Sequence, residues 1–257
     1  MSSAGHPPGA SAVLAGPAPA AISREPSRTS SAFDTAFLTT GEGITELVLV
    51  RHGEQDVPVG PQVPIGVMHD PPLSERGRAQ AYAVGLRFAA ERIDAVYASP
   101  LARAFDTGAQ IARHHGLDMT VEPDVREVEV FRDVPQDRPI VETLGRRALL
   151  GMRQRMQIDR KWDVYSHSEG SAEFRKRTVN AIEGIVATHP GERVVVACHG
   201  GVICAYLGWI LGQNQDMWFR PGHTSVNVVR ALNAVRVVET IGDSNHLRTL
   251  EGDLRSW

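Results

Sequence analysis

The sequence predicts an α/β fold, a single three-layer domain in which helices cover both faces of a mostly parallel sheet. Two observations support this prediction. The apolar runs "LVLV" and "VVVAC" have strand length and no polar alternation, which is typical of parallel strands buried on both faces. Segments with helical periodicity alternate with these runs, and a hydrophobic content of 42% in 257 residues is enough for a large core.

The first strand is expected at residues 46–50, where the chain reads "ELVLV". A helix is predicted over 73–93, with Ser74 as its N-cap. Helical spacing predicts that its buried face carries Tyr82, Leu86, Ala89 and Ile93.

A second strand and helix follow directly. The strand is predicted at 93–99, and the helix over 100–116 is opened by Pro100 and closed by Gly116. A short strand is expected at 117–123.

The second half of the domain repeats the alternation. A helix is predicted within 168–191, a strand at 193–199 and a helix over 201–211, before two further strands at 224–231 and 234–241. The expected buried face of the first of these helices carries Phe174, Ile182, Ile185 and Val186.

Composition narrows the function classes. The net charge of -3 gives no general attraction to nucleic acid or to anionic membranes, and no run of about 18 apolar residues is present. The two cysteines, Cys198 and Cys204, form neither a disulfide framework nor a zinc motif, which favours a reducing cytoplasm. We expect a disordered leader rich in Ala, Pro and Ser at 1–43, the domain at 44–250 and a tail at 251–257.

Three predicted strands end in residues that suit an anion. The first runs into Arg51 and His52, the second has Arg103 one turn into the helix that follows it, and "VVVAC" runs into His199. Ligands of such sheets bind at the carboxyl ends of the strands, so these residues converge if the strands are neighbours. Two cations and two imidazoles suit a phosphate dianion.

These residue types can support phosphoryl transfer. Arg51 can hold a phosphate bidentately, and Gly53 lets backbone N–H groups approach the oxygens. A neutral His52 whose tautomer is fixed can attack phosphorus, while Arg103 and His199 neutralise the charge of the transferring group. A carboxylic acid must also protonate the leaving oxygen.

The chain resembles the histidine phosphatase superfamily, also called phosphoglycerate-mutase-like. The matching segments are "LVLVRHGE" (47–54), "HDPPLSERGRAQA" (69–81), "YASPLARAFDTGAQIA" (97–112), "EGSAEFRKRTVNAI" (169–182), "VVVACHGGVI" (194–203) and "DSNHL" (243–247). The resemblance implies that His52 is the phosphorylated nucleophile and that Glu127 is the proton donor. It also implies that Arg51, Arg103 and His199 are phosphate ligands. We expect Gly53 and Gly200 to bind the substrate beside them.

Three departures from the family pattern affect these assignments. Pro58 stands where many members have an Asn phosphate ligand. Glu127 lacks the Gly-x-Trp-x-Gly stretch that often follows the acid, so Glu129 is a competing proton donor. The chain also lacks the Arg-His-Tyr-Gly sequence that follows the acid in mutases, which favours a phosphatase.

A basic insert is predicted at about 128–167. Its central part contains eight basic residues against four acids, namely Arg132, Arg138, Arg146, Arg147, Arg153, Arg155, Arg160 and Lys161 against Asp133, Asp137, Glu142 and Asp159. Such an insert can be a lid that recognises the rest of an anionic substrate, or a solvated helical face. The sequence leaves both interpretations open.

The sequence therefore predicts a cytoplasmic, metal-independent phosphomonoester hydrolase for a small anionic phosphorylated metabolite, with no cofactor, nucleic-acid partner or membrane partner. A phosphomutase and a catalytically silent phospho-ligand scaffold are the alternatives. A metal on His52 and His199 is disfavoured because two arginines would repel it. Cys198 should point into the core, since neighbouring residues of a strand face opposite sides. The sequence leaves open whether the protein forms a homodimer.

Overall fold

The computed structural model describes residues 31–60, 62–249 and 252–257. Its centre is a six-stranded sheet of order β3-β2-β4-β1-β5-β6, in which the first four strands are parallel and β5 runs antiparallel to both neighbours. The strands are β1 (Thr45–Arg51), β2 (Ala95–Ala98), β3 (Met119–Val121), β4 (Arg193–Cys198), β5 (Val226–Leu232) and β6 (Val235–Asp243). A small second sheet pairs β7 (Arg248–Thr249) with β8 (Gly252–Asp253).

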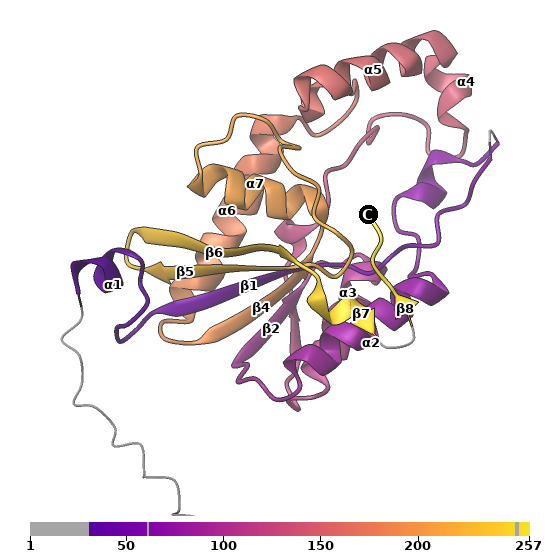
Figure 1. Cartoon of the computed structure of the whole chain (residues 1–257). Coiled ribbons are helices and arrows are strands. Elements are labelled where there is room, and N and C mark those ends of the chain that lie inside the picture. Colours follow the sequence, from indigo (N-terminus) through magenta and orange to yellow (C-terminus); the bar gives the residue numbers. More distant parts are fainter. Residues whose placement is uncertain (1–30, 61, 250–251) are drawn as a thin grey trace, which may run out of the picture.

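Helices cover both faces of the large sheet, which confirms the predicted three-layer α/β domain (Figure 1). One face carries α2 (Glu75–Phe88) and α3 (Ala102–Ala112), and the other carries α6 (Ser171–Thr188) and α7 (Gly200–Ile210). The insert between them holds α4 (Ile140–Leu144) and α5 (Arg146–Asp159), which arch beyond the carboxyl ends of the strands. Short 3-10 helices lie at Ile65–Met68, Pro123–Val125, Trp162–Val164 and Asn245–Leu247.

The core divides into two parts because successive strand residues face opposite sides. Leu47 and Leu49 of β1 pack with Cys198 and the α6–α7 layer, whereas Val48 and Val50 pack against α2 and α3. Cys198 is fully buried, as predicted, and burial raises the pKa of its thiol, which leaves it inert.

Helix α2 has the predicted N-cap but a different buried face. Ser74 Oγ accepts the N–H of Gly77 at 3.0 Å. The buried residues are Gly77, Gln80, Ala81, Val84, Gly85 and Phe88, whereas Tyr82 and Leu86 are each 49% exposed. Small residues on this face let the helix approach α3 so closely that a Cβ on Gly85 would lie 2.4 Å from the carbonyl oxygen of Gln110. The prediction was therefore wrong for Tyr82, Leu86 and Ala89, which are exposed, whereas Ile93 is buried as predicted but lies beyond the end of the helix.

The other helices lie near their predicted positions. Helix α3 begins two residues after Pro100, with Leu101 as its N-cap, and Gly116 follows it in the left-handed region at φ 63°. The four predicted core residues of α6 are buried. Helix α7 begins at Gly200, directly after His199.

The predicted disordered leader, residues 1–43, overlaps the described chain only from residue 31 onward. Residues 1–30 lie outside the described residues. Disorder is wrong for 32–38, because α1 (Ala32–Ala36) forms with a capping box between Ser31 and Asp34, and Leu38 is buried. Within the described chain, no helix combines the length and the apolar content that crossing a membrane requires.

The loop after β1 packs against α2 at two glycines. A Cβ on Gly77 would lie 1.9 Å from the carbonyl oxygen of Glu54, and a Cβ on Gly53 would lie 2.4 Å from the carbonyl oxygen of Gly77. We predict that Gly77→Ala lowers the free energy of unfolding by about 1–3 kcal/mol, because the loop must shift to make room. The measurement is the urea midpoint.

Gly184→Ala is the matched control, since Gly184 also lies within a helix but a Cβ there meets nothing within 4 Å. Replacing a helical glycine by alanine at an open site should stabilise by about 0.5–1 kcal/mol. Equal midpoints for the two variants would contradict the close approach.

Candidate active site

Three neighbouring parallel strands bring the predicted residues to one edge of the sheet. Strand β4 lies between β2 and β1, and Arg51 is in register with Cys198. His52 and His199 therefore leave adjacent strands side by side, and their ring centroids lie 5.1 Å apart. Arg103 reaches the same place from the first turn of α3, with its Nε 3.4 Å from His52 Nε2.

The tautomer of His52 is fixed by its own loop. His52 Nδ1 lies 2.6 Å from the carbonyl oxygen of Gly53. A carbonyl only accepts, so Nδ1 must carry the proton and Nε2 keeps its lone pair, which points toward Arg103. Burial lowers the pKa of His52 well below its ordinary value, and the neighbouring titratable ring of His199 and the charges of Arg103 and Arg51 lower it further. The ring is therefore neutral.

His199 is also neutral and lies at the centre of the site. It is fully buried, its Nε2 lies 2.8 Å from Ser99 Oγ, and its Nδ1 has no hydrogen-bond partner among the described residues. Burial, together with the charges of Arg103, Arg51 and Arg177, lowers the pKa of His199.

The two arginines supply the positive charge. Arg103 is buried and donates from Nη1 to the carbonyl oxygen of His69 at 3.1 Å, with Asp70 Oδ1 at 3.5 Å. Arg51 donates from Nη1 to the carbonyl oxygen of Pro221 at 2.5 Å, while its buried Nε has no partner in the described chain. Burial lowers the pKa of Arg51 to about 10, so it stays charged at neutral pH. A phosphate dianion would satisfy both the charges and the unpaired donor.

The backbone N–H of Gly53 already has a hydrogen-bond partner. Its N–H donates to Thr107 Oγ1 at 3.1 Å, one helical turn after Arg103. This N–H is therefore not free to bind phosphate, and the missing side chain instead allows the approach to Gly77. Gly200, the other predicted glycine ligand, is the first residue of α7, where backbone N–H groups favour an anion.

Glu127 lies closer to these cations than its competitor Glu129. Glu127 Oε2 accepts the N–H of Gly201 at 3.1 Å. Burial lowers the pKa of both Arg51 and Arg103, and the negative charge of Glu127 offsets part of that lowering. The carboxylate of Glu129 instead lies 3.4 Å from Arg126 and forms an ion pair there. The geometry favours Glu127 as the proton donor.

The loop that carries Glu127 is held by Arg177 of α6. Its guanidinium donates to the carbonyl oxygens of Asp124, Arg126 and Glu127 at 2.7, 2.9 and 3.1 Å. It also pairs with Glu169, whose side chain is fully buried. The resemblance covered this segment, but nothing in its pattern indicated the contact with the acid loop.

Sequence reasoning also missed His223, which is tied to the C-terminal segment. Its ring centroid lies 5.8 Å from that of His52, and its Nδ1 lies 2.7 Å from Ser256 Oγ. Gln80 donates its amide to the same hydroxyl at 2.9 Å. Figure 1 places the C-terminus beyond the carboxyl ends of the strands, on the side of the site. A lone histidine before a strand carries no recognisable signal, whereas Ser99 could have been found from the strand-end rule.

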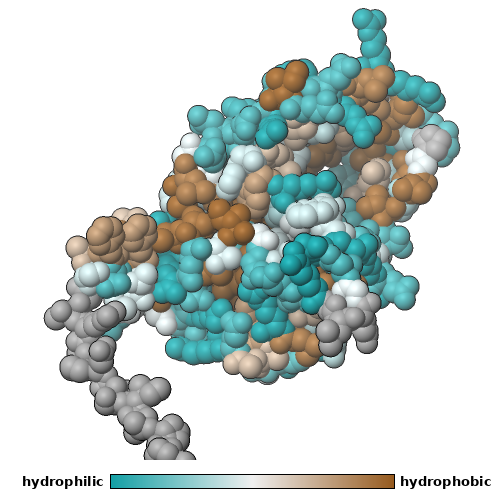
Figure 2. All heavy atoms as spheres, viewed as in Figure 1, coloured by the Kyte–Doolittle hydropathy of each residue, from teal (hydrophilic) through white to brown (hydrophobic). Residues whose placement is uncertain are grey.

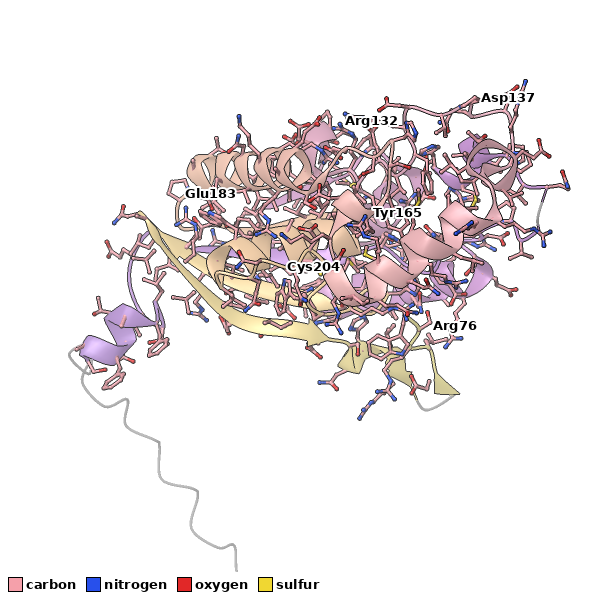
Figure 3. All side chains as sticks on the ribbon, turned by 90° about the horizontal axis from the view of Figure 1, so that it is seen from above. Arg76, Arg132, Asp137, Tyr165, Glu183 and Cys204 are labelled. Atoms are coloured by element: carbon pink, nitrogen blue, oxygen red, sulfur yellow. The ribbon has the colours of Figure 1, made fainter. Side chains whose placement is uncertain are left out.

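A pocket of about 730 Å³ adjoins Arg103 and Glu127 (Figure 2). The insert contributes Arg132 and Tyr165, labelled in Figure 3, from the segments before α4 and after α5. Arg146 and Arg147 are exposed on α5 and do not line this pocket, which favours the solvated-face interpretation for them. The exposed Pro58 does not line it either.

Among the residues that the structure describes, no three histidine, cysteine, aspartate or glutamate side chains gather closely enough to hold a metal ion. His52 and His199 instead face arginines. The centre is therefore suited to an anion.

A comparison with family models identifies the family of the chain. The model of the histidine phosphatase superfamily (branch 1) matches residues 47–244. The chain belongs to this superfamily. The resemblance seen in the sequence motifs is thereby confirmed.

Relatives in this superfamily include two from Arabidopsis thaliana. A metal-independent phosphoserine phosphatase is 29% identical, over 80% of this chain and 85% of its own. Phosphoglycerate mutase-like protein 4 is 30% identical, over 79% of this chain and 86% of its own. The fold is similar to that of a mycobacterial glucosyl-3-phosphoglycerate phosphatase, with a TM-score of 0.65, 22% identity and coverage of 78% of this chain and 100% of that one.

The buried histidines predict acid sensitivity. The pKa of His223 is lowered to about 3 by burial and by nearby arginines, and those of His52 and His199 are lowered as well. Above about pH 6.5 these rings are neutral in both states. Below it the unfolded chain binds protons that the folded protein does not, so the free energy of unfolding falls with pH until the folded pKa is reached.

His223→Asn should remove one of the protons that the unfolded chain binds and the folded protein does not. We predict that the slope of unfolding free energy against pH decreases by up to about 1.4 kcal/mol per unit between about pH 5.5 and 4.5, as measured by urea denaturation. His167→Asn, at an exposed histidine, is the control substitution. Parallel curves for wild type and His223→Asn would contradict burial of a neutral ring.

Proposed function

We propose that the protein is a metal-independent phosphomonoester hydrolase that acts through a phosphohistidine at His52. The observation that carries this proposal is the state of the His52 ring. Its Nδ1 is locked to the carbonyl of Gly53, and its Nε2 lone pair faces the buried guanidinium of Arg103. A binding scaffold has no need of such a nucleophile.

In the first step, His52 Nε2 attacks phosphorus while the bond to the leaving oxygen breaks. Arg51, Arg103 and the polar ring of His199 stabilise the equatorial oxygens. Protonated Glu127 gives its proton to the leaving oxygen, and the alcohol departs.

In the second step, water attacks phosphorus from the side that the alcohol has left. The Glu127 carboxylate takes the proton of that water as the P–N bond breaks, so inorganic phosphate leaves and neutral His52 is restored. One acid thus serves both halves of the reaction, and no metal is needed to generate the nucleophile.

The names of the relatives support hydrolysis. Two of the three reported above are named phosphatases, and one of these is named metal-independent. In this proposal the phosphoryl group itself supplies the anionic character that the sequence predicted for the substrate.

We predict that His52→Ala lowers kcat to below about 1% of wild type, because loss of covalent catalysis removes several kcal/mol of barrier stabilisation. Quenching the wild type in alkali during turnover of a phosphorus-labelled ester should leave label on the His52 peptide. Activity should persist in EDTA. A variant with substantial activity, or activity that chelation abolishes and Zn²⁺ or Mg²⁺ restores, would contradict the mechanism.

The leaving group distinguishes Glu127 from Glu129. Glu127→Gln should slow phosphorylation of His52 by an alkyl phosphate about 10²- to 10⁴-fold, because an alkoxide needs a proton to depart. With nitrophenyl phosphate the first step should be nearly normal, and more phosphoenzyme should accumulate because water lacks a base. Glu129→Gln is the matched control, and an exchange of behaviours between the two variants would show that the acid is misassigned.

A further inference from the structure

The pocket beside Arg103 and Glu127 lies where the leaving alcohol must depart. Glu127 is the proposed donor to the leaving oxygen, and both residues line the pocket. Its volume of about 730 Å³ falls within the ordinary range of small-molecule sites. Figure 2 shows a hollow beneath the α4–α5 arch with apolar residues at its edge. The shape of this pocket therefore bears on the part of the substrate beyond the phosphoryl group.

Apolar side chains from several segments form most of its wall. They include Ile65, Leu101, Val130, Phe131, Ile140 and Tyr165. The rings of Phe131 and Tyr165 meet edge to face, with centroids 5.6 Å apart. Phe131 is held at φ 61°, a left-handed conformation that is costly for an aromatic residue and that recurs at ligand-binding sites.

The cations of the wall are already paired. Arg126 lies 3.1 Å from Asp124 and 3.4 Å from Glu129, and Arg132 lies 3.2 Å from Glu173 and 3.9 Å from Glu129. Among the arginines that line the pocket, Arg103, which also lies 3.5 Å from Asp70, is the one that faces His52 and the phosphoryl position. A second anionic group on the substrate would thus have to compete with carboxylates for Arg126 or Arg132.

Two polar side chains of the wall, His69 and Gln136, are already paired, whereas the buried Nε1 of Trp162 has no hydrogen-bond partner among the described residues. His69 Nε2 lies 2.7 Å from Gln136 Oε1, and the Gln136 amide donates to the carbonyl oxygens of Phe131 and Val134 at 3.1 and 2.7 Å. A carboxylate or a second phosphate would therefore find one free neutral donor in this wall, the indole of Trp162, but no unpaired cation besides Arg103 to balance its charge. An uncharged apolar group meets no such penalty.

We propose that the substrate is a phosphomonoester of an uncharged alcohol that carries an aromatic ring or an apolar group of similar size. This inference rests on the proposed function, and it differs in substrate class from an ester such as phosphoserine, which bears a carboxylate. The ring lies against Phe131 and Tyr165, and the ester oxygen points to Glu127. Each methylene buried in such a pocket should raise kcat/KM by about three- to fourfold.

The test compares three esters of primary alcohols with similar basicity, namely propyl phosphate, 3-phenylpropyl phosphate and 4-carboxybutyl phosphate. We expect kcat/KM for the phenylpropyl ester to exceed that for the propyl ester by at least about tenfold, since the ring adds several buried carbon atoms. The carboxybutyl ester should be no better than the propyl ester. Equal values for all three, or preference for the carboxylate, would overturn the proposal.

Two lysine substitutions in the insert locate the effect. Ile140→Lys places an unpaired cation in the apolar wall at the first residue of α4, and should reverse the preference between the phenylpropyl and carboxybutyl esters. Leu150→Lys is the control, because Leu150 is 59% exposed on α5 and outside the pocket. Equal responses to the two substitutions would assign any effect to general charge and contradict the pocket.

Failure of the proposed function gives a different result. If the wild type hydrolyses none of the three esters, the hydrolase proposal is wrong. Dissociation constants of the same esters, measured by calorimetry, then test the preference of the pocket for an apolar group independently of hydrolysis. Tighter binding of the phenylpropyl ester supports the apolar pocket, and equal binding overturns it.

Discussion

The parallel pairing of β1 with β4 is the constraint on which the site depends. The register that sets Arg51 opposite Cys198 makes His52 and His199 leave the sheet side by side. The pairing of β4 with β2 then places Ser99 against His199, and the helix after β2 brings Arg103 to His52. A one-residue shift of β1 would turn Arg51 and His52 each to the other face of the sheet and so separate His52 from Arg103 and His199.

Electrostatics explains why this arrangement suits phosphate. The buried guanidinium of Arg103 and the partly buried one of Arg51 lie beside two buried imidazoles. Burial lowers the pKa of all four groups, so the imidazoles are neutral, whereas the arginines start from a much higher pKa and stay charged. Such unbalanced positive charge is costly in a folded core, and Glu127 offsets only part of it. A bound dianion would neutralise the remaining positive charge. The interactions that stabilise the phosphoryl group would therefore also remove the electrostatic cost that these arginines impose on the folded protein.

The sequence predicted those parts of the molecule that regular structure determines. Parallel strands end at one edge, which is why the sequence alone predicts that Arg51, His52, Arg103 and His199 lie together. The buried face of α2 was not predictable from large apolar residues, since its approach to α3 depends on glycine and alanine. Likewise, the hold of Arg177 on the acid loop and the contact of Ser256 with His223 join distant, irregular segments that share no periodicity.

The central claim is that phosphorus is attacked twice, first by His52, which displaces the alcohol, and then by water, which displaces His52. Each in-line displacement inverts the configuration at phosphorus, so the stereochemical course counts the displacements directly. A phosphorothioate monoester made chiral with oxygen isotopes, hydrolysed in water of a third oxygen isotope, would yield chiral inorganic thiophosphate. The account predicts overall retention of configuration. Inversion would show that water attacks the substrate directly, and would contradict a phosphohistidine intermediate.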